Sequence, residues 1–415
     1  MYYFFYRIYH FILKTLVSLI GIPDPILYQG KEGLETWLST QKPNTKLLVV
    51  TDKTLAELAI PDVILEHMRS AQIQWYLYID VAVNPTIENV ENGVVCYQQQ
   101  QCQGIVAIGG GSVMDCAKLI AARVTRPNKS LPQLKGLFKI IKSLPPVCAI
   151  PTTAGTGSET TVAAVVNDPQ KKAKYAVTDF VLVPKSAILM AELTLSLPPT
   201  ITATTGLDAL THAIEAYIGI NGSTYSDEKA LAAIKLIFSE LPVVYTHTDN
   251  VAAREKMLLA SFYAGQAFTR ASVGYIHAIA HQLGANYGTA HGLANSVLLM
   301  PVLRFYGPAV YPKLAEIARY CHFSSANNSV TEDAMCFLNE LDNLLVKLNI
   351  PSFLAEIKQQ DIKTLAAAAI QEAHPGYPVP VFMDRAQCES ILQKVSPTIH
   401  NEESFLSSST LLMKN

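Results

Sequence analysis

Short apolar runs alternate with helical segments between residues 46 and 153, and this alternation constrains the fold more than any other feature. The segments between the runs, such as 53–71 and 113–125, have the periodicity of helices. The apolar runs are KLLVVTD (46–52), WYLYIDV (75–81), GIVAIGG (104–110) and PVCAIPTT (146–153). Runs that are apolar on both faces are typical of buried parallel strands, so the pattern predicts a mostly parallel sheet covered by helices, with right-handed crossovers.

Beyond Pro198-Pro199 the sequence becomes helical almost to its end. Good helix formers and few glycines predict helices at 226–242, 250–272, 291–306, 331–348 and 361–373. A chain of 415 residues suggests two or three domains. We therefore expect an amino-terminal helical extension, an α/β nucleotide-binding domain and an all-α metal-binding domain, at 1–25, 26–197 and 198–415.

Ionisable side chains gather in two stretches of the helical part. His277 and His281 stand at positions i and i+4, which lie on one face of a helix, and so do Asp208 and His212. His291 follows a turn-like break that would let a new helix return to the same point. Imidazole and carboxylate groups suit Zn or Fe, so these five groups predict a metal site. The remaining histidines are expected to be ordinary surface or core residues: His10, His67, His247, His322, His374 and His400.

The third apolar run leads directly into a glycine-rich turn, Gly109-Gly110-Gly111-Ser112, and then a helix. Glycines there allow the backbone to approach a diphosphate, whose charge would face the amino-terminal end of the helix. The turn is not the GxGxxG fingerprint, and a purely structural role for its glycines stays open.

Hydroxyl groups follow the fourth apolar run at the same edge of the predicted sheet, where open α/β sheets bind their ligands. The group consists of Thr152, Thr153, Thr156, Ser158 and Thr160. Two such loops side by side predict a nucleotide site. Asp52 ends the first run and would accept hydrogen bonds from a ribose and repel a 2′-phosphate; an equally good interpretation is that it caps the next helix.

Residues 1–25 are strongly apolar and aromatic, yet Arg7, His10, Lys14 and Ser18 recur at spacings of three and four. This pattern predicts an amphipathic helix rather than a membrane span or a cleaved signal peptide. Two interpretations stay open, peripheral membrane contact through residues 1–20 and packing on the body of the protein or a partner subunit, and we favour packing.

Charge and cysteine content indicate which partners and which compartment to expect. The net charge of −2 and dispersed basic residues give no electrostatic footprint for nucleic acid, so no nucleic-acid partner is expected. Seven scattered cysteines without a CxxC pair favour a reducing compartment, and we expect a cytoplasmic protein.

Six motifs taken together resemble the iron-containing (group III) alcohol dehydrogenases of the dehydroquinate synthase-like fold. The resemblance runs from about Ile26 to about Arg385. The motifs are TDK at Thr51, VNPT at Val83, GGGSVMDCAK at Gly109, PTTAGTGSE at Pro151, TGLDALTHAIEAY at Thr205 and the histidine stretch from Tyr275 to Leu293.

The resemblance implies a role for each matching residue. Asp208, His212, His277 and His291 would be the metal ligands, and His281 would be the non-ligand histidine near the nicotinamide. The dinucleotide would be held by Gly110, Gly111, Ser112, Asp115, Thr152, Thr153, Thr156 and, around the ribose and adenine, Asp52, Asn84 and Lys174.

The expected activity is metal-dependent interconversion of a small alcohol and its aldehyde. The family implies Fe(II), or Zn in some members, NAD in preference to NADP because of Asp52, and a homodimer or larger assembly. The metal would polarise the substrate oxygen while hydride passes to the nicotinamide, and His281 would carry the proton. We place Phe268 in the substrate pocket, with a plain core position as its alternative.

Three pairs depart from the family pattern without removing a ligand: Met190-Ala191, Thr269-Arg270 and His374-Pro375. Arg270 follows Phe268 closely and would welcome a carboxylate or phosphate on the substrate. A polyol or hydroxy-acid dehydrogenase is therefore the main alternative, and a dehydroquinate synthase-type lyase is the more distant one.

Overall fold

The computed structural model describes residues 2–171 and 173–397; His400 and the rest of the predicted carboxyl-terminal segment 398–415 lie outside the described residues. A six-stranded sheet forms the centre of the first half, and each of its strand pairs is parallel. In spatial order the strands are β1 (Ile26–Gln29), β9 (Ser186–Leu189), β6 (Val147–Pro151), β4 (Gly104–Gly109), β2 (Lys46–Val50) and β3 (Gln74–Tyr78). The predicted parallel sheet is therefore confirmed, with each of the four apolar runs in it.

Helices cover both faces of this sheet because its strands are apolar on both sides. Leu48 and Val50 of β2 pack with the helices of one face, whereas Leu47 and Val49 pack with those of the other. The first face carries α5 (Ile87–Gln99) and α6 (Gly111–Thr125), and the second carries α2 (Gly30–Ser39) and α4 (Asp62–Ser70).

The helical stretch predicted at 53–71 is two helices rather than one. The first, α3 (Lys53–Glu57), ends before Ala59, whose φ of 55° is left-handed, and α4 begins after Pro61. A left-handed residue and a proline both interrupt the α-helical hydrogen-bond ladder, which explains the break.

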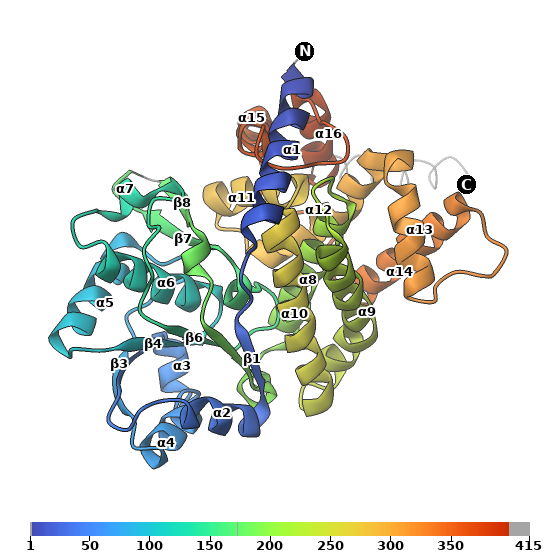
Figure 1. Cartoon of the computed structure of the whole chain (residues 1–415). Helices are drawn as coiled ribbons and strands as arrows, with labels where there is room; N and C mark the ends of the chain where they lie inside the picture. Colours follow the sequence, from blue (N-terminus) through green and yellow to red (C-terminus); the bar gives the residue numbers. More distant parts are fainter. Residues whose placement is uncertain (1, 172, 398–415) are drawn as a thin grey trace, which may run out of the picture.

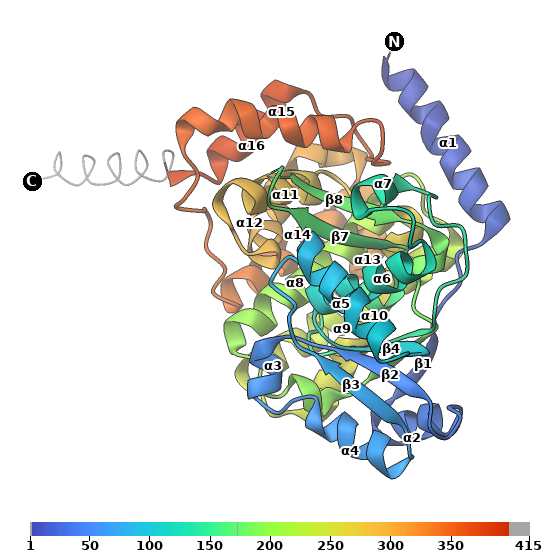
Figure 2. The same cartoon turned by 90° about the vertical axis from the view of Figure 1, so that its left-hand side faces the viewer.

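A smaller sheet adjoins the large one. It joins β5 (Gly136–Leu137), β8 (Ala173–Thr178) and β7 (Ala163–Asp168), with α7 (Leu131–Leu134) beside it. Strands β7 and β8 are antiparallel, and this hairpin stands beside α11 (Figure 2).

The second half is a bundle built around α8 (Pro199–Ile218), which is buried over most of its length. All of its residues from Gly206 to Ile218 are buried, and α8 is enclosed by α9, α10 and α12 (Figure 1). The helices that follow α8 are α9 (Thr224–Thr246), α10 (Val251–Ala271), α11 (Tyr275–Tyr287), α12 (His291–Tyr306), α13 (Tyr311–Tyr320), α14 (Val330–Lys347), α15 (Ile362–Ala373) and α16 (Arg385–Lys394). The predicted all-α texture of this half is confirmed.

The amino-terminal helix α1 (Tyr2–Ile20) stands at a corner of the molecule (Figures 1 and 2), where Tyr3 and Arg7 contact the segment between α15 and α16. Among the described residues, no single helix combines the length and hydropathy needed to cross a bilayer. One sharply bent pair, His291–Ala309 with Tyr311–Tyr320, meets that test by length and composition alone.

Candidate metal and nucleotide site

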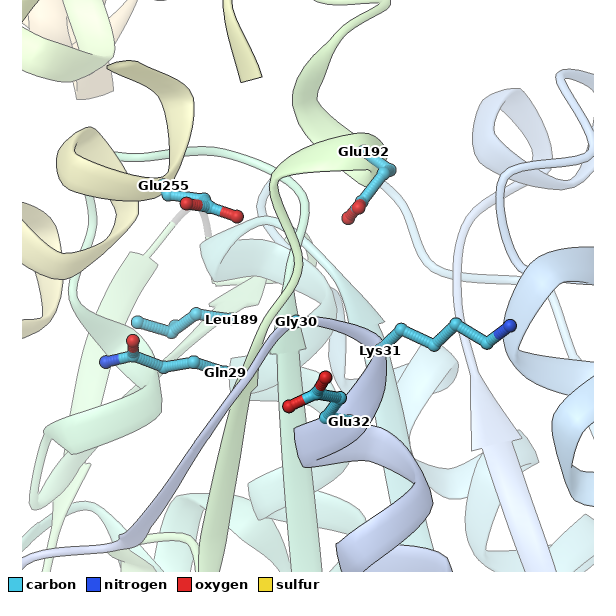
Figure 3. A pocket seen from close by; sticks show the side chains of 7 residues that line it. All are labelled: Gln29, Gly30, Lys31, Glu32, Leu189, Glu192 and Glu255. Atoms are coloured by element: carbon cyan, nitrogen blue, oxygen red, sulfur yellow. The ribbon is translucent and has the colours of Figure 1, made fainter. Parts of the chain in front are cut away.

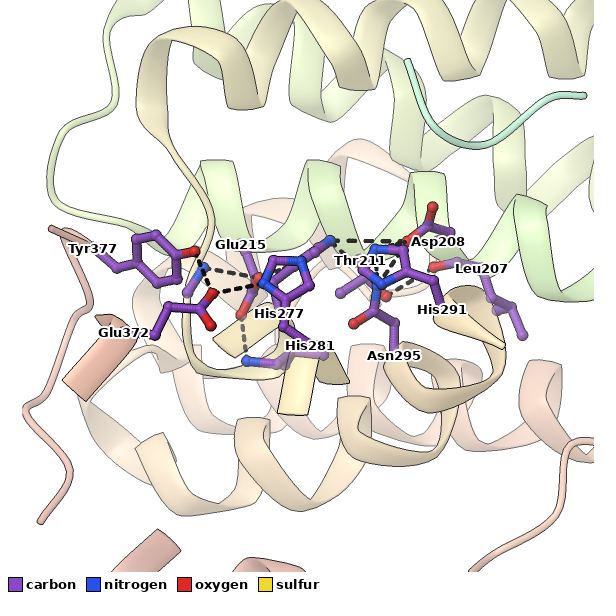
Figure 4. Close-up of polar contacts among 12 residues, drawn as sticks. Leu207, Asp208, Thr211, Glu215, His277, His281, His291, Asn295, Glu372 and Tyr377 are labelled. Carbon is purple, nitrogen blue, oxygen red and sulfur yellow. Dashed lines mark hydrogen bonds and ion pairs between the residues drawn. The ribbon is translucent and has the colours of Figure 1, made fainter. Parts of the chain in front are cut away.

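The two histidine-containing stretches meet inside the helical bundle. Asp208 and His212 come from α8, His277 from α11, and His291 from the first turn of α12. One ligand atom from each lies within 4.8 Å of the others. Figure 4 shows Asp208, His277 and His291 of this group. The return of His291 depends on the end of α11 at Gly288, whose φ of 72° suits glycine.

Asn295, one turn after His291, points its side-chain amide at the same spot. Its Nδ2 donates to Asp208 Oδ1 at 2.7 Å and lies 3.2 Å from Nε2 of both His277 and His291. Three atoms that can act as acceptors therefore converge on one neutral amide nitrogen. This convergence is what a bound cation requires, so the residues present fit a divalent metal.

Burial sets the charge of this cluster. It lowers the pKa of His212 to about 3 and holds the pKa of His277 well below its usual value, while it raises the pKa of the Asp208 carboxyl. The imidazoles are consequently neutral near pH 7, and neutral imidazole nitrogens are the form that binds a metal.

Glu215 orients His277 from behind, and the sequence interpretation missed it. Its Oε2 accepts from His277 Nδ1 at 2.6 Å and from Gly274 N at 2.8 Å, and its Oε1 accepts from Ile276 N at 2.8 Å. Burial raises the pKa of Glu215 to about 7. Its spacing gave a signal, because positions 208, 212 and 215 follow one helical face at i, i+4 and i+7.

His281 lies beside the cluster and is held by a second carboxylate. Its Nδ1 is 2.6 Å from Oε1 of Glu372 on α15, and its ring stacks on His291 with centroids 5.3 Å apart. Glu372 also accepts from Gln282 Nε2 at 2.7 Å and from the Tyr377 hydroxyl at 2.8 Å (Figure 4). Sequence reasoning missed Glu372, since nothing local connects it to a histidine so far away along the chain.

The glycine turn and the threonine loop face each other at the ends of β4 and β6. These strands pair so that Gly109 lies opposite Pro151, which brings the two loops to one sheet edge. A Cβ built on Gly111 would lie 3.0 Å from Thr156, and one on Gly110 would lie 3.3 Å from Thr153 Oγ1. The structure thus brings together these predicted cofactor residues: Gly110, Gly111, Ser112, Thr152, Thr153 and Thr156.

Three further predicted residues lie around this edge. Lys174 Nζ donates to Asn84 Oδ1 at 2.8 Å, and Asn84 N donates to Ser112 Oγ at 3.2 Å, which connects the β7–β8 hairpin to the glycine turn. Asp52 accepts a hydrogen bond from Leu55 N at 2.9 Å. It therefore caps α3, which is one of the two interpretations that the sequence left open for this residue.

Asp115 holds the threonine loop against α6. Its Oδ1 accepts from Ser158 Oγ at 2.7 Å and its Oδ2 accepts from Val165 N at 2.9 Å. Beside it the buried Lys118 donates to Ser158 Oγ and to Thr161 Oγ1, at 3.1 and 2.7 Å. Burial lowers the pKa of Lys118 to about 8. Both carboxylate oxygens of Asp115 are therefore engaged by the protein.

Phe268 and Arg270, both from α10, point to different places. The Phe268 ring stacks on His212 with centroids 4.1 Å apart, so it lies against the metal cluster. Arg270 instead binds the amino-terminal linker, with Nη2 3.0 Å from Asp24 Oδ2 and 2.7 Å from Ile22 O. The expectation that Arg270 serves the substrate is wrong, because residues two apart on a helix point in nearly opposite directions.

A separate surface cavity of about 320 Å³ lies beyond the ends of β1 and β9 (Figure 3). It shares no residue with the metal cluster or the two loops. Its lining consists of Gln29, Gly30, Lys31, Glu32, Leu189, Glu192 and Glu255.

Comparison with known proteins agrees with this geometry. Residues 25–191 match the family "Iron-containing alcohol dehydrogenase", and residues 202–396 match "Fe-containing alcohol dehydrogenase family, C-terminal". The 1,3-propanediol dehydrogenase of Klebsiella pneumoniae is 36% identical over 333 residues, covering 79% of this chain and 86% of that one.

Solved structures share the fold across most of the chain. A 1,3-propanediol oxidoreductase superposes with a TM-score of 0.85 at 32% identity, covering 90% of this chain and 99% of that one. The sulfoacetaldehyde reductase of Bifidobacterium kashiwanohense, solved with NAD+, superposes with a TM-score of 0.80 at 27% identity, covering 90% and 98%. The chain belongs to the iron-containing alcohol dehydrogenase family and is an oxidoreductase of that family.

Proposed function

We propose that the protein interconverts a small alcohol and its aldehyde with NAD(H), using Fe(II) or Zn held by Asp208, His212, His277 and His291. The observation that carries this proposal is the convergence of these four ligand atoms within 4.8 Å. A divalent ion bound there supplies Lewis-acid polarisation of the substrate oxygen. The residues around it orient its ligands, enclose the substrate and carry the proton.

Glu215 and Phe268 prepare the site. By accepting a hydrogen bond from His277 Nδ1–H, Glu215 fixes the tautomer whose Nε2 lone pair is free for a ligand bond. The Phe268 ring covers one face of His212 and gives the substrate an apolar wall. An enclosed apolar wall excludes water and strengthens the electrostatic interactions within the site.

His281 is the proposed proton carrier. The bond between its Nδ1 and Glu372 leaves Nε2 to exchange a proton with the substrate hydroxyl. The partly exposed side chains of His281 and Glu372 give that proton a route to solvent.

NAD is proposed to lie on the two facing loops, with its diphosphate at the start of α6. The free backbone N–H groups at that helix end attract negative charge. Asn84 and Lys174 stand at the rim of these loops, and a free carboxylate oxygen on Asp52 would disfavour the 2′-phosphate of NADP.

A neutral substrate is favoured over a hydroxy acid because Arg270, the cation expected to attract a carboxylate, is committed to Asp24. The relative named as a 1,3-propanediol dehydrogenase supports a short alcohol or diol. A polyol is the second candidate.

The assembly, compartment and division of the chain are also proposed. We propose a homodimer or larger assembly in the cytoplasm, a compartment supported by seven cysteines that are free thiols. We propose domain boundaries near residues 25 and 197, and the helical unit begins at α8.

The test uses protein reconstituted without oxygen with Fe(II) or with Zn. It is offered short alcohols, diols, polyols and hydroxy acids with NAD and with NADP. The expected outcome is turnover of short alcohols or diols with NAD.

The His281→Ala variant sharpens this test, since it should keep the metal and lose rate. Turnover confined to hydroxy acids would contradict the neutral-substrate proposal. Equal rates in wild type and the His281→Ala variant would contradict the assigned proton carrier.

A further inference from the structure

Helix α1 turns Arg7 and His10 toward the protein. Arg7 donates to the carbonyl oxygens of Val379 and Pro380, at 2.7 and 2.8 Å. His10 is fully buried, with Nε2 2.6 Å from Pro375 O. These bonds commit the polar side of the helix to the segment that follows α15.

Aromatic contacts fix the same orientation. The Tyr3 ring stacks on Phe382 with centroids 4.4 Å apart and an interplanar angle of 6°, and the Arg7 guanidinium lies 4.2 Å from the centroid of the same ring. Rotating α1 to bury its other side would break both the stacking and the bonds of Arg7. The helix is therefore held against the protein by this face, and its opposite face points outward.

That outward face is an apolar stripe, defined by Tyr2, Phe4, Phe5, Ile8, Phe11, Ile12, Leu16 and Leu19. Phe4, Phe11 and Leu19 are 68%, 70% and 79% exposed. Figure 2 shows α1 at the edge of the molecule, with its outer side away from the other elements. A surface helix in water normally shows the opposite arrangement, so this face fits an apolar partner.

Charge identifies the kind of partner. Residues 2–23 contain no Asp or Glu, although the whole chain is slightly acidic. Arg7 and His10 face the body of the protein, so the exposed cation of this segment is Lys14, whose Nζ lies 3.5 Å from Ile220 O. The first carboxylate, Asp24, is paired with Arg270. A region that is apolar, rich in Tyr and Phe and free of negative charge complements the headgroup region of a bilayer with anionic lipids.

We propose that the α1 stripe docks the enzyme on the surface of a bilayer that contains anionic lipids, with the helix lying in the plane of the interface. Arg7 and His10 stay bound to the body, which prevents α1 from crossing the membrane. The proposal extends beyond the catalytic assignment and does not depend on it, since the stripe shares no residue with the metal cluster.

The test is flotation of the full-length, metal-loaded enzyme with phosphatidylcholine vesicles in which phosphatidylglycerol makes up about a third of the lipid. The wild type should float with the vesicles. The triple variant Phe4→Ser, Phe11→Ser, Leu19→Ser should partition at least about a hundredfold more weakly, since three large apolar side chains no longer enter the interface. The matched control Leu58→Ser, Ile141→Ser, Val346→Ser also changes three exposed apolar residues and should float like the wild type.

A charge variant tests the second element of the proposal. Lys14→Glu should weaken partitioning by about fivefold or more on anionic vesicles and have little effect on pure phosphatidylcholine. Alcohol oxidation in solution should be equal in all of these variants, which separates this test from that of the catalytic proposal.

Wild-type protein that stays in solution with anionic vesicles would overturn the proposal, as would equal flotation of the triple variant. Sedimentation equilibrium adds another decisive outcome. If the triple variant converts a wild-type dimer to monomer and vesicles bind neither, the stripe is a contact between two copies and the membrane proposal is wrong.

Discussion

The metal cluster and the nucleotide loops use different means to prepare a site. In the metal cluster, side chains of fixed chemistry project from three packed helices, and their approach depends on helical spacing and on where α11 and α12 begin. In the glycine turn and the threonine loop, which are proposed to hold the nucleotide, glycines and hydroxyls lie where strands end, so the backbone itself would face the ligand. The metal cluster therefore depends on which side chains are present, whereas the two loops depend on glycines that leave room for the backbone to approach a ligand.

Removing one of the proposed metal ligands should have the largest effect, because it should abolish metal binding and leave the two loops unchanged. His277→Ala should abolish tight metal binding and lower turnover by about a thousandfold, because the ion that polarises the substrate is lost. Metal analysis and steady-state rates measure both effects, with His67→Ala on α4 as the control. One tightly bound equivalent of metal in His277→Ala would break the proposed ligand set.

Acid should weaken the metal-free helical half through His212. Its pKa is about 3 in the folded state and about 6.5 in the unfolded chain, so between these values only the unfolded chain binds the proton. The free energy of unfolding should therefore fall by a few kcal/mol as pH drops from about 6.5 toward 3. Urea unfolding of metal-free protein at successive pH values measures this slope.

The matched variants for the acid experiment are His212→Asn and His67→Ala. His67 is the single histidine of residues 26–197 and is partly exposed on α4. The slope should become shallower in His212→Asn, with the remainder coming from His277 and His291, whose pKa values burial also lowers, and it should be unchanged in His67→Ala. Equal slopes in the two variants would remove His212 from the explanation.

Loss of the carboxylate behind His281 should affect rate but not metal binding. Glu372→Gln should lower kcat by about 10- to 100-fold, because the imidazole loses its charged partner, and should leave the KM for NAD unchanged. Glu389→Gln, which loses a surface partner of Arg385, is the control. A parallel loss of bound metal would show that Glu372 supports the cluster rather than His281.

The smallest effect is expected from added bulk in the nucleotide loops. Gly111→Ala places a Cβ 3.0 Å from Thr156 and should raise the KM for NAD about tenfold, with metal content unchanged. Gly284→Ala adds the same methyl group to α11, where its nearest contact is an ordinary 3.5 Å, and should leave the KM alone. Equal KM values in both variants would mean that the loops do not hold the cofactor closely.

The sheet and the long helices could be predicted because their signals are local. Apolar runs marked the strands, and the i, i+4 pairs at Asp208 and His277 placed ligand-type side chains on one helix face. The same spacing would have included Glu215 if the face had been followed for one more turn. The break at Ala59 was missed because a left-handed residue other than glycine leaves little trace in the sequence and because the signal given by Pro61 was overlooked.

Features set by tertiary packing were not predictable from the chain. Glu372 meets His281 only because α15 packs against α11. The pattern of residues 1–25 predicted a two-faced helix but not which face would turn inward, since that depends on the acceptors at Val379 and Pro380. Arg270 was misplaced because nearness in sequence was taken for nearness in space.

The position of the four ligands on α8, α11 and α12 has a consequence for folding. The site exists only after these three helices have packed, so an ion that binds there binds the native state and not the unfolded chain. The ion then acts as a crosslink, and mass action makes the stability of the helical half depend on the free metal concentration. Metal scarcity would remove both the activity and part of the thermodynamic stability of the same molecule.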